Sequence, residues 1–485
     1  MRPPFLLLLP SLALLACKPA PPASHAHPAP AAPNAAPPAV AGEEAMLKEF
    51  AGAYPDEASP NGRVRAFELV AAEAELPLID GNKLRVWAYN GQVPGPTLRI
   101  RLGETLRVRF VNRLPEPSTI HWHGIRLPND MDGVPTPKRP AIPPGGKFTY
   151  EFTPKDAGTY WFHPHIRSSE QVERGLFGVL IVEDAQPPAF DREEVWVLDD
   201  WLLDETRQVH GRFNTRHDLA HDGRWGNVIT VNGRTDTRLV LATGERVRLR
   251  MVNVANGRIF APQFEGVRAR VIAVDGLYLR EPIPLTRFEL APGNRLDLEL
   301  VADEETSRAF QVIDTFYAKR PNRLAELVVD GAVDKRPALQ LPTAHVPAWR
   351  GGLELPVHQV FRLNARQGGE FGIEWTINDH AFAGHHHDHP AIVTLQRKRW
   401  YRLQFANDSY RLHPIHIHGM FFRLLARNGQ PVDEPFFRDT VLVHGRETVD
   451  IALVPTDVGD WMMHCHILEH AEAGMMTMVA VTDGP

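Results

Sequence analysis

Short runs in which polar and apolar residues alternate fill this chain, and no long segment shows the period of an amphipathic helix. The run GETLRVRFVN, residues 103–112, alternates with period two. That period is typical of a strand with one face buried and one face in water. Glycine and proline separate such runs along the chain, so we expect short strands joined by turns. The sequence therefore predicts an all-β fold.

The same run recurs twice, as GERVRLRMVN at 244–253 and KRWYRLQFAN at 398–407. The copies start about 140 to 155 residues apart, close to the roughly 150 residues expected of one domain. A chain of 485 residues is also too long for a single hydrophobic core. We therefore predict three homologous Greek-key β-barrel or β-sandwich domains, at 60–186, 187–345 and 346–485.

The N-terminus has the pattern of a targeting segment. Arg2 precedes the apolar run FLLLLPSLALLAC, which is too short to span a membrane as a stable helix and is typical of a signal peptide. Its end, LLAC, resembles a bacterial lipobox, in which the cysteine, here Cys17, carries the lipid. An ordinary cleaved signal peptide is the alternative. We predict a lipoprotein-type signal at 1–17 and export to the periplasmic side of a bacterial membrane, with the chain anchored through Cys17.

Residues 18–59 are rich in alanine and proline in their first part and predict a stiff tether and lead-in. The formal net charge is -6 and no basic stretch stands out, which argues against a nucleic-acid partner. The chain is expected to act as a monomer and to meet a membrane only through its N-terminal lipid.

Histidine pairs of the form His-X-His occupy matching places in the first and last repeats. Nine residues after the terminal Asn of the run come HWHG in the first repeat and HIHG in the last, whereas the middle repeat has Pro262 and Phe264 there. A later pair matches between the same two repeats. In a strand, both rings of a pair face one side, about 6.6 Å apart at roughly 3.3 Å per residue. Eight imidazoles would converge if the outer domains pack together: His121, His123, His163, His165, His416, His418, His464 and His466.

Cys465 lies between two of these histidines and has no cysteine left to pair with, because the only other one is in the signal segment. The pleat of a strand would turn its thiolate to the face opposite the histidines. A thiolate with two imidazoles and a long thioether bond is the blue-copper ligand set. Candidates are Cys465, His413, His470 and Met475. The first repeat has Ser118, Pro164 and Ser169 where the last has His413, Cys465 and His470, so we expect no such site there.

The segments HWHG, HPH, HPIHIHG and HCHILEHAEAGM resemble the four copper signatures of the multicopper oxidases. The resemblance implies three cupredoxin-like domains and four copper ions: one type 1, one type 2 and two type 3. By motif, the type 1 ion would be held by His413, Cys465, His470 and Met475, and the type 2 ion by His121 and His416. One type 3 ion would take His123, His163 and His466, and the other His165, His418 and His464.

The implied reaction takes single electrons from a phenol, an aromatic amine or a low-valent metal ion, passes them through Cys465, and reduces dioxygen to water with four. The family relays protons through carboxylates. Asp132 resembles one of these, although it could be an ordinary loop residue before a glycine. Relatives often have Glu directly after the second type 1 histidine; here that place holds Ala471. Glu472 is the candidate, with Glu469 on the other side, so the second relay residue stays open.

Several alternatives remain at this point. A dedicated metallo-oxidase for copper tolerance is the runner-up, and a copper-free scaffold of the cell envelope is a more distant one. The segment NDHAFAGHHHDHP, residues 378–390, holds five histidines, His385 to His387 and His389 among them, and could collect metal or be a solvated loop. Asp408 could bind a donor or cap a turn. His210, His217 and His221 are assigned no role.

Overall fold

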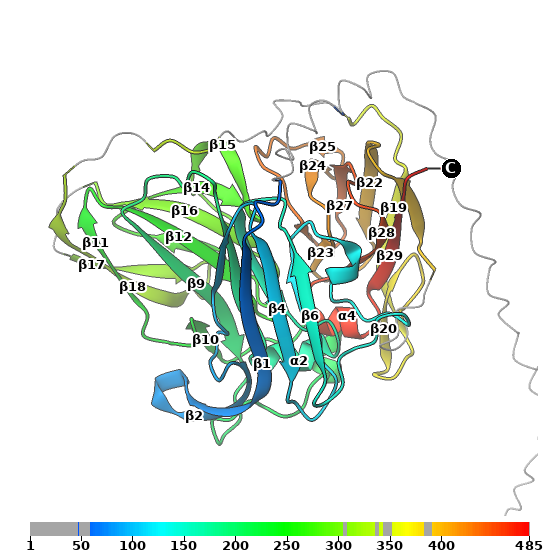
Figure 1. The fold of residues 1–485 in the computed structure, drawn as a ribbon, viewed down its shortest axis with the longest axis horizontal. Helices are drawn as coiled ribbons and strands as arrows, with labels where there is room; N and C mark the ends of the chain where they lie inside the picture. The colour runs from blue at the N-terminus through cyan, green and yellow to red at the C-terminus, as the bar shows by residue number, and fades with distance from the viewer. Residues whose placement is uncertain are drawn as a thin grey trace, which may run out of the picture.

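The computed structural model describes Leu47 and residues 59–303, 308–334, 339–342, 352–382 and 390–484. The predicted signal segment with Cys17, nearly all of the tether and the histidines from His385 to His389 lie outside the described residues. Within them the all-β prediction is confirmed: strands dominate and the helices are short (Figure 1). None of the described helices has the length and apolar content needed to cross a membrane.

The first part of the chain, 64–183, forms two sheets. One has the order β2 (Lys83–Tyr89), β1 (Val64–Pro77), β4 (Thr105–Asn112), β6 (Lys147–Phe152). The other has the order β3 (Leu98–Arg101), β8 (Gly178–Glu183), β7 (Gly158–His163), β5 (His121–His123). Three short helices lie in connections between strands: η1 (Ile79–Gly81), η2 (Asn129–Met131) and α2 (Ser168–Glu173).

The middle part, 192–332, repeats this plan with more strands. One sheet has the order β10 (Val228–Val231), β9 (Arg192–Trp201), β12 (Arg246–Asn253), β16 (Arg295–Val301), β14 (Arg268–Val274), β15 (Leu277–Pro284). The other has the order β11 (Arg238–Thr243), β18 (Asn322–Ala332), β17 (Arg308–Asp314), β13 (Pro262–Phe264). The helix α3 (Arg216–Ala220) lies in a connection between β9 and β10.

The last part, 359–482, again has two sheets. One has the order β20 (Ile373–Ile377), β19 (Gln359–Gln367), β22 (Tyr401–Asn407), β27 (Thr448–Leu453), β24 (Phe422–Arg427), β25 (Gln430–Pro431). The other has the order β21 (Val393–Gln396), β29 (Met476–Thr482), β28 (Gly459–Cys465), β23 (His413–Ile417), β26 (Thr440–Val443). The helix α4 (Leu468–Glu472) follows β28.

The three repeated runs are the equivalent strands β4, β12 and β22. Each pairs in parallel with the first strand of its part and antiparallel with a later one. Each ends in an asparagine, Asn112, Asn253 or Asn407, whose side-chain nitrogen donates to two loop carbonyl oxygens at 2.8 to 2.9 Å. Its side-chain oxygen accepts the amide two residues later. The asparagine thereby fixes the turn that leads toward β5, β13 and β23, the strands that carry the first histidine pairs or their middle counterparts.

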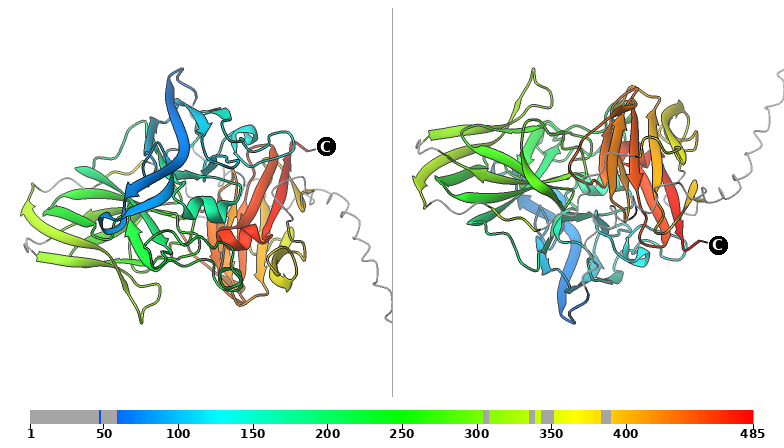
Figure 2. Two further views of the ribbon diagram at one scale, coloured as in Figure 1. Left: turned by 90° about the horizontal axis from the view of Figure 1, so that it is seen from below. Right: turned by 90° about the horizontal axis from the view of Figure 1, so that it is seen from above.

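The three parts lie around a common centre, with the first part (blue to cyan) and the last (orange to red) side by side (Figures 1 and 2). One hydrophobic cluster joins these two parts, because it contains Trp122 and Tyr160 from the first together with Phe421 and Phe437 from the last. Burial of such large apolar side chains is worth about 1.5 to 3 kcal/mol each and holds the outer parts together. The domain limits at 60, 187 and 346 stay a prediction.

Candidate metal centre

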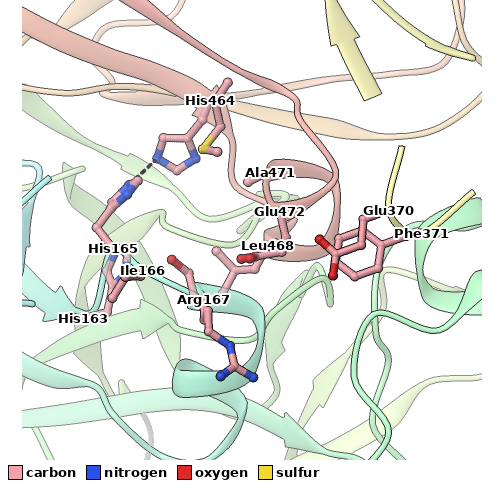
Figure 3. A pocket seen from close by; sticks show the side chains of 12 residues that line it. His163, His165, Ile166, Arg167, Glu370, Phe371, His464, Leu468, Ala471 and Glu472 are labelled. Carbon is pink, nitrogen blue, oxygen red and sulfur yellow. Dashed lines mark hydrogen bonds between the residues drawn. The ribbon is translucent and has the colours of Figure 1, made fainter. Parts of the chain in front are cut away.

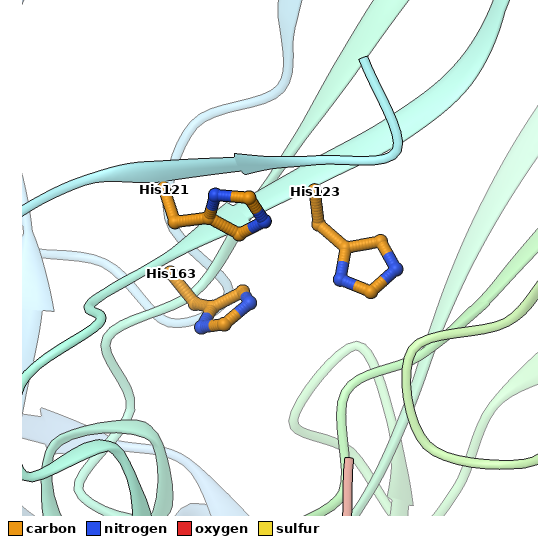
Figure 4. A group of neighbouring side chains, drawn as sticks. All are labelled: His121, His123 and His163. Carbon is orange, nitrogen blue, oxygen red and sulfur yellow. The ribbon is translucent and has the colours of Figure 1, made fainter. Parts of the chain in front are cut away.

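Eight histidine rings gather at the contact between the first and last parts, and all are buried. Rings from the two parts lie against each other in matching pairs. His121 stacks on His418 with ring centroids 3.9 Å apart, and His123 stacks on His416 at 3.8 Å. His163 and His165 contact the pair that flanks Cys465, at 5.5 and 5.0 Å. Figure 4 shows three of the rings contributed by the first part. The convergence expected from the sequence is therefore present.

Strand pairing sets this arrangement in the same way in both parts. His121 lies opposite His163 in the antiparallel pair β5 and β7, and His416 lies opposite His464 in β23 and β28. The expectation that every pair lies within a strand is wrong for three pairs, because β7 ends at His163, β23 at Ile417 and β28 at Cys465. In β7 the reason is Pro164, which has no N–H to continue the ladder. The two rings of each pair nevertheless lie 4.9 to 6.0 Å apart.

Five of the rings are fixed through Nδ1. The Nδ1–H groups of His121, His163, His416 and His464 donate to backbone carbonyl oxygens at 2.8 to 2.9 Å, and that of His418 donates to the Asp132 carboxylate at 2.9 Å. Their Nε2 lone pairs then face the cluster. Those of His121, His163 and His416 have no hydrogen-bond partner among the described residues. A buried nitrogen without a partner costs free energy, so this cluster is suited to a cation.

Two further contacts support the same conclusion. Nε2 of His464 lies 3.1 Å from Nε2 of His418 and 3.4 Å from Nε2 of His165. Three lone pairs directed at one point repel each other unless a positive ion lies between them. Burial lowers the pKa of the His165, His418 and His464 imidazoles, to about 3 for His464, so these three rings are neutral at pH 7. Neutral imidazole is the form that binds copper.

A second cluster surrounds Cys465. Its Sγ lies 3.6 Å from Nδ1 of His413 and 3.7 Å from Nδ1 of His470, and these two nitrogens are 3.2 Å apart. All three side chains are fully buried. The other ring nitrogens are held from outside, His413 Nε2 at 3.0 Å from Ser409 Oγ and His470 Nε2 at 2.7 Å from the carbonyl oxygen of His221.

The burial of the Cys465 thiol determines whether this second cluster can hold a thiolate without a metal ion. Burial raises the pKa of the Cys465 thiol well above its ordinary value, because a buried thiolate loses its hydration. A thiolate at this place therefore requires a nearby cation. Met475 is buried beside it: its carbonyl oxygen accepts the Cys465 amide at 3.0 Å, and its own amide donates to His470. The donor set is the one that a blue copper ion uses.

Asp132 lies between two histidines from different parts. Its carbonyl oxygen accepts His121 Nδ1–H, and its carboxylate accepts His418 Nδ1–H at 2.9 Å. Such contacts fix the ring and the tautomer of a metal ligand. Asp132 is buried and follows η2 directly before Gly133, so it is a loop residue whose side chain contacts the histidine cluster.

Asp439 is a residue that the sequence reasoning missed. It repeats the contacts of Asp132 in the last part: its carbonyl oxygen accepts His416 Nδ1–H at 2.9 Å, and its carboxylate lies 3.3 Å from His123 Nε2. Arg295 of the middle part forms an ion pair with it at 2.6 Å. Burial opposes ionisation, but Arg295 outweighs burial and lowers the pKa of Asp439 to about 2. No local signal in the sequence marks Asp439, because its partners His123 and Arg295 come from the other two parts of the chain.

Glu472 and Glu469, both in α4, have different surroundings. Glu472 lines a cavity of about 60 Å³ that His163, His165 and His464 also line (Figure 3). Glu469 accepts the Asn256 amide at 2.7 Å and the Arg224 backbone N–H at 3.1 Å. Burial raises the pKa of each carboxyl to about 7. Of the two, the structure brings Glu472 to the histidine cluster.

Asp408 lies at the surface, where its carboxylate forms an ion pair with Arg362 at 2.9 Å. This ion pair tests neither of the roles considered for Asp408, which were binding a donor and capping a turn. An exposed pair of this kind contributes little to stability.

Comparison with known proteins identifies the chain. The multicopper oxidase family models match residues 71–187, 192–328 and 355–485. Multicopper oxidase MmcO of Mycobacterium tuberculosis is 29% identical over 460 residues, covering 86% of this chain and 87% of that protein. The crystal structure of a multi-copper oxidase from Pseudomonas thermotolerans is 35% identical with a TM-score of 0.76, covering 86% of this chain and 99% of that one. The chain belongs to the multicopper oxidase family, copper-binding oxidoreductases of cupredoxin-like fold that use dioxygen.

Proposed function

We propose that this protein removes single electrons from phenols, aromatic amines or low-valent metal ions and uses four of them to reduce one dioxygen to two waters. One observation carries the proposal. Cys465 lies between His464 and His466, so a single chain segment contributes its thiol to one cluster and two imidazoles to the other. Two metal clusters are thus joined by covalent bonds within three consecutive residues.

The ligands that we propose follow from these two clusters. His413, Cys465, His470 and Met475 would hold one type 1 copper ion. His121 and His416 would hold a type 2 ion. The two type 3 ions would take His123, His163 and His466, and His165, His418 and His464. Copper at these sites would supply one-electron redox chemistry and a centre for dioxygen.

The protein's own groups prepare these sites. Backbone carbonyl oxygens and the Asp132 carboxylate accept Nδ1–H, which keeps the Nε2 lone pairs directed inward. Burial excludes water from the thiol and from both histidines of its cluster. The proposal therefore needs little rearrangement of side chains when copper binds.

Protons must also reach the eight-histidine cluster, and two carboxyl groups are placed to supply them. Glu472 lines the cavity beside His163, His165 and His464. Asp132 contacts His418 and lies within 3.3 Å of His121 Nδ1. We propose that Glu472 and Asp132 relay protons toward the cluster, because a relay group must lie within hydrogen-bond reach or one water of its acceptor.

The stoichiometry of the reaction tests this proposal. With a substituted phenol as donor, oxygen uptake should equal one dioxygen for every four donor electrons, and no hydrogen peroxide should accumulate. A ratio of two electrons per dioxygen with peroxide release would contradict it. Boiled protein and protein dialysed against a copper chelator serve as controls.

A second candidate is a metallo-oxidase that acts on Cu(I) in copper tolerance. It is favoured by relatives named Copper resistance protein A, of which the one from Escherichia coli is 25% identical over 566 residues, covering 86% of this chain and 92% of that protein. The ratio of kcat/KM for Cu(I) to that for the phenol separates the candidates. The same ratio should be measured after alanine replaces His385 to His387, which lie outside the described residues.

Export and lipid attachment are proposed from the sequence of residues 1–17. In a bacterial host, labelled fatty acid should be incorporated into the full chain and not into Cys17→Ala. Incorporation of the labelled fatty acid into both proteins, or into neither, would contradict lipid attachment at Cys17. The proposed domain limits can be checked by limited proteolysis, which should cut near 187 and 346 before cutting within the sheets.

A further inference from the structure

The histidines around Cys465 are closed off from solvent, which restricts how an electron donor can reach them. His413 and His470 are both fully buried. The outer nitrogen of His470 donates to the carbonyl oxygen of His221 at 2.7 Å, and that oxygen belongs to the middle part. A donor at this edge therefore meets the segment around His221 before it can meet His470.

His221 lies between solvent and His470. Its backbone carbonyl oxygen accepts a hydrogen bond from His470, and its side chain is exposed. The ring lies against that of His217, also exposed, with centroids 4.2 Å apart and planes 33° apart. Its Nδ1–H donates to the His217 carbonyl oxygen at 2.9 Å, which leaves Nε2 as a free lone pair. This is the arrangement in which metal-binding histidines are usually held.

The two histidines are four residues apart, in HDLAH: His217 lies in α3, and His221 directly follows the helix with an extended backbone. The short helix α3 is fixed at both ends. At its start Thr215 and Asp218 form a reciprocal capping box, and near its end the Leu219 carbonyl accepts the Trp375 indole N–H at 2.9 Å. The pair is therefore held in a constant position over the His470 edge.

A negative charge lies next to the pair. Asp222 directly follows His221, and its carboxylate accepts the Leu412 amide at 3.0 Å. Leu412 immediately precedes His413. The carboxylate thus joins the middle part to the strand of the second cluster, and it also forms an ion pair with the Arg411 guanidinium at 4.0 Å.

We propose that His217 and His221 form the docking site for a metal-ion donor, Cu(I), and that the His221 carbonyl is where its electron reaches His470. The inference rests on the proposed function and specifies its donor site. Each Cu(I) docked there loses one electron and leaves as Cu(II). Four such events with one dioxygen and four protons give four Cu(II) and two waters. Imidazole is a suitable ligand for both copper oxidation states.

The aromatic side chains near this edge are less suited to bind a donor. Trp225 donates its indole N–H to the Asp222 carbonyl at 2.8 Å, but the Arg258 guanidinium lies over its ring at 4.6 Å. Tyr410 is exposed, and the Arg446 guanidinium lies over its ring at 4.0 Å. Each ring thus already has a cation on one face, whereas the two histidines offer unoccupied lone pairs.

The double variant His217→Ala, His221→Ala tests the site on the copper-loaded protein. The backbone carbonyl at 221 remains, so the blue absorption band should not change. We expect kcat/KM for Cu(I) to fall by about tenfold or more, while kcat/KM for a neutral phenol changes by less than about twofold. His210→Ala, in the same connection of the middle part, is the matched control and should leave both values unchanged.

Binding of Ag(I), a redox-inert substitute for Cu(I), gives a readout independent of turnover. The measurement starts from a variant with alanine at His385, His386, His387 and His389. Replacing His217 and His221 with alanine as well should lower the number of Ag(I) ions bound per chain, measured by calorimetry, by one. Unchanged Ag(I) binding, or an unchanged kcat/KM for Cu(I), would overturn the site, as would an equal loss of phenol oxidation. Failure of the wild type to consume oxygen with any donor would instead refute the proposed function, and the Ag(I) result would still report on the site.

Discussion

The first and last parts contain two copies of the same strand and helix, β7 with α2 and β28 with α4, and only the second copy has the thiol and imidazole donors of the cluster around Cys465. In the last part Cys465, His413 and His470 direct a sulfur and two nitrogens at one another within 3.7 Å. In the first part the matching residues are Pro164, Ser118 and Ser169.

The copy in the first part satisfies most of its polar groups from within the protein. The Ser118 hydroxyl donates to the Gln171 side-chain oxygen at 2.8 Å, and the Gln171 nitrogen donates to Glu116 and to the Pro117 carbonyl at 2.8 and 2.9 Å. Among the described residues, the Ser169 hydroxyl, the Trp161 indole N–H and His163 Nε2 of this copy have no hydrogen-bond partner. The same strand-and-helix framework therefore occurs both with and without the His413, Cys465 and His470 donors. The sulfur and nitrogen donors that face each other in the last part therefore depend on the identity of its side chains and not on the backbone framework, which both copies share.

The largest effect should come from Cys465→Ser. Serine cannot supply a soft thiolate, so the blue absorption band and the steady-state oxidation of every donor should be lost. Absorption spectra and oxygen uptake measure these losses. Retention of more than about one hundredth of the wild-type rate would argue against an electron path through this residue.

His121→Ala should disturb the eight-histidine cluster and leave the cluster around Cys465 intact, the opposite of Cys465→Ser. The removed imidazole belongs only to the eight-histidine cluster, so the blue band should stay while oxygen uptake stops. Stopped-flow reduction of the blue band by a phenol should remain fast, and its reoxidation by air should be slow. Persistent oxygen uptake would refute the role proposed for His121.

The carboxylates Asp132 and Asp439 make equivalent contacts but should respond differently to substitution. Asp132→Asn keeps an acceptor for His418 and loses a charge, so kcat should fall about 10- to 100-fold with little change in Tm. Asp439→Asn leaves the buried Arg295 without its closest partner and should lower the free energy of unfolding by about 3 kcal/mol. Thermal unfolding and turnover, measured on both variants, distinguish the two outcomes. A reversed pattern would contradict the account.

Glu472→Gln should have a smaller effect, lowering kcat about tenfold. Since burial raises the pKa of Glu472 to about 7, the carboxyl carries its proton below that pH and loses it above. The wild-type kcat should therefore decline as pH rises through about 7, and the variant should lose this step. Glu469→Gln is the matched control, because Glu469 has the same pKa of about 7 but hydrogen-bonds Asn256 and Arg224. A pH step retained in Glu472→Gln and lost in Glu469→Gln would reverse the assignment.

Ser169→Ala should have the smallest effect. Its hydroxyl is buried without a partner, so its removal should leave the copper content unchanged and alter the free energy of unfolding by less than about 1 kcal/mol. Loss of copper in this variant would show that Ser169, which occupies the place of His470, contributes to a copper site.

The strands β4, β12 and β22 could be predicted because their signal is local: alternation with period two and a terminal asparagine. The histidine pairs could be predicted because the repeats align them. Asp439 and the contact between His221 and His470 could not, because they depend on how the three parts pack. Asp439 reaches His123 across 316 residues, and His221 reaches His470 across 249. Contacts between residues so far apart in the sequence leave no periodic pattern from which they could be predicted.

Copper content of the purified protein, together with its absorption spectrum, tests whether two separate copper clusters are joined through Cys465. We expect four copper ions per chain and a blue band in the wild type, and three ions without the band in Cys465→Ser. Two or fewer ions in the wild type, or loss of all copper in Cys465→Ser, would contradict two separate clusters joined through this residue.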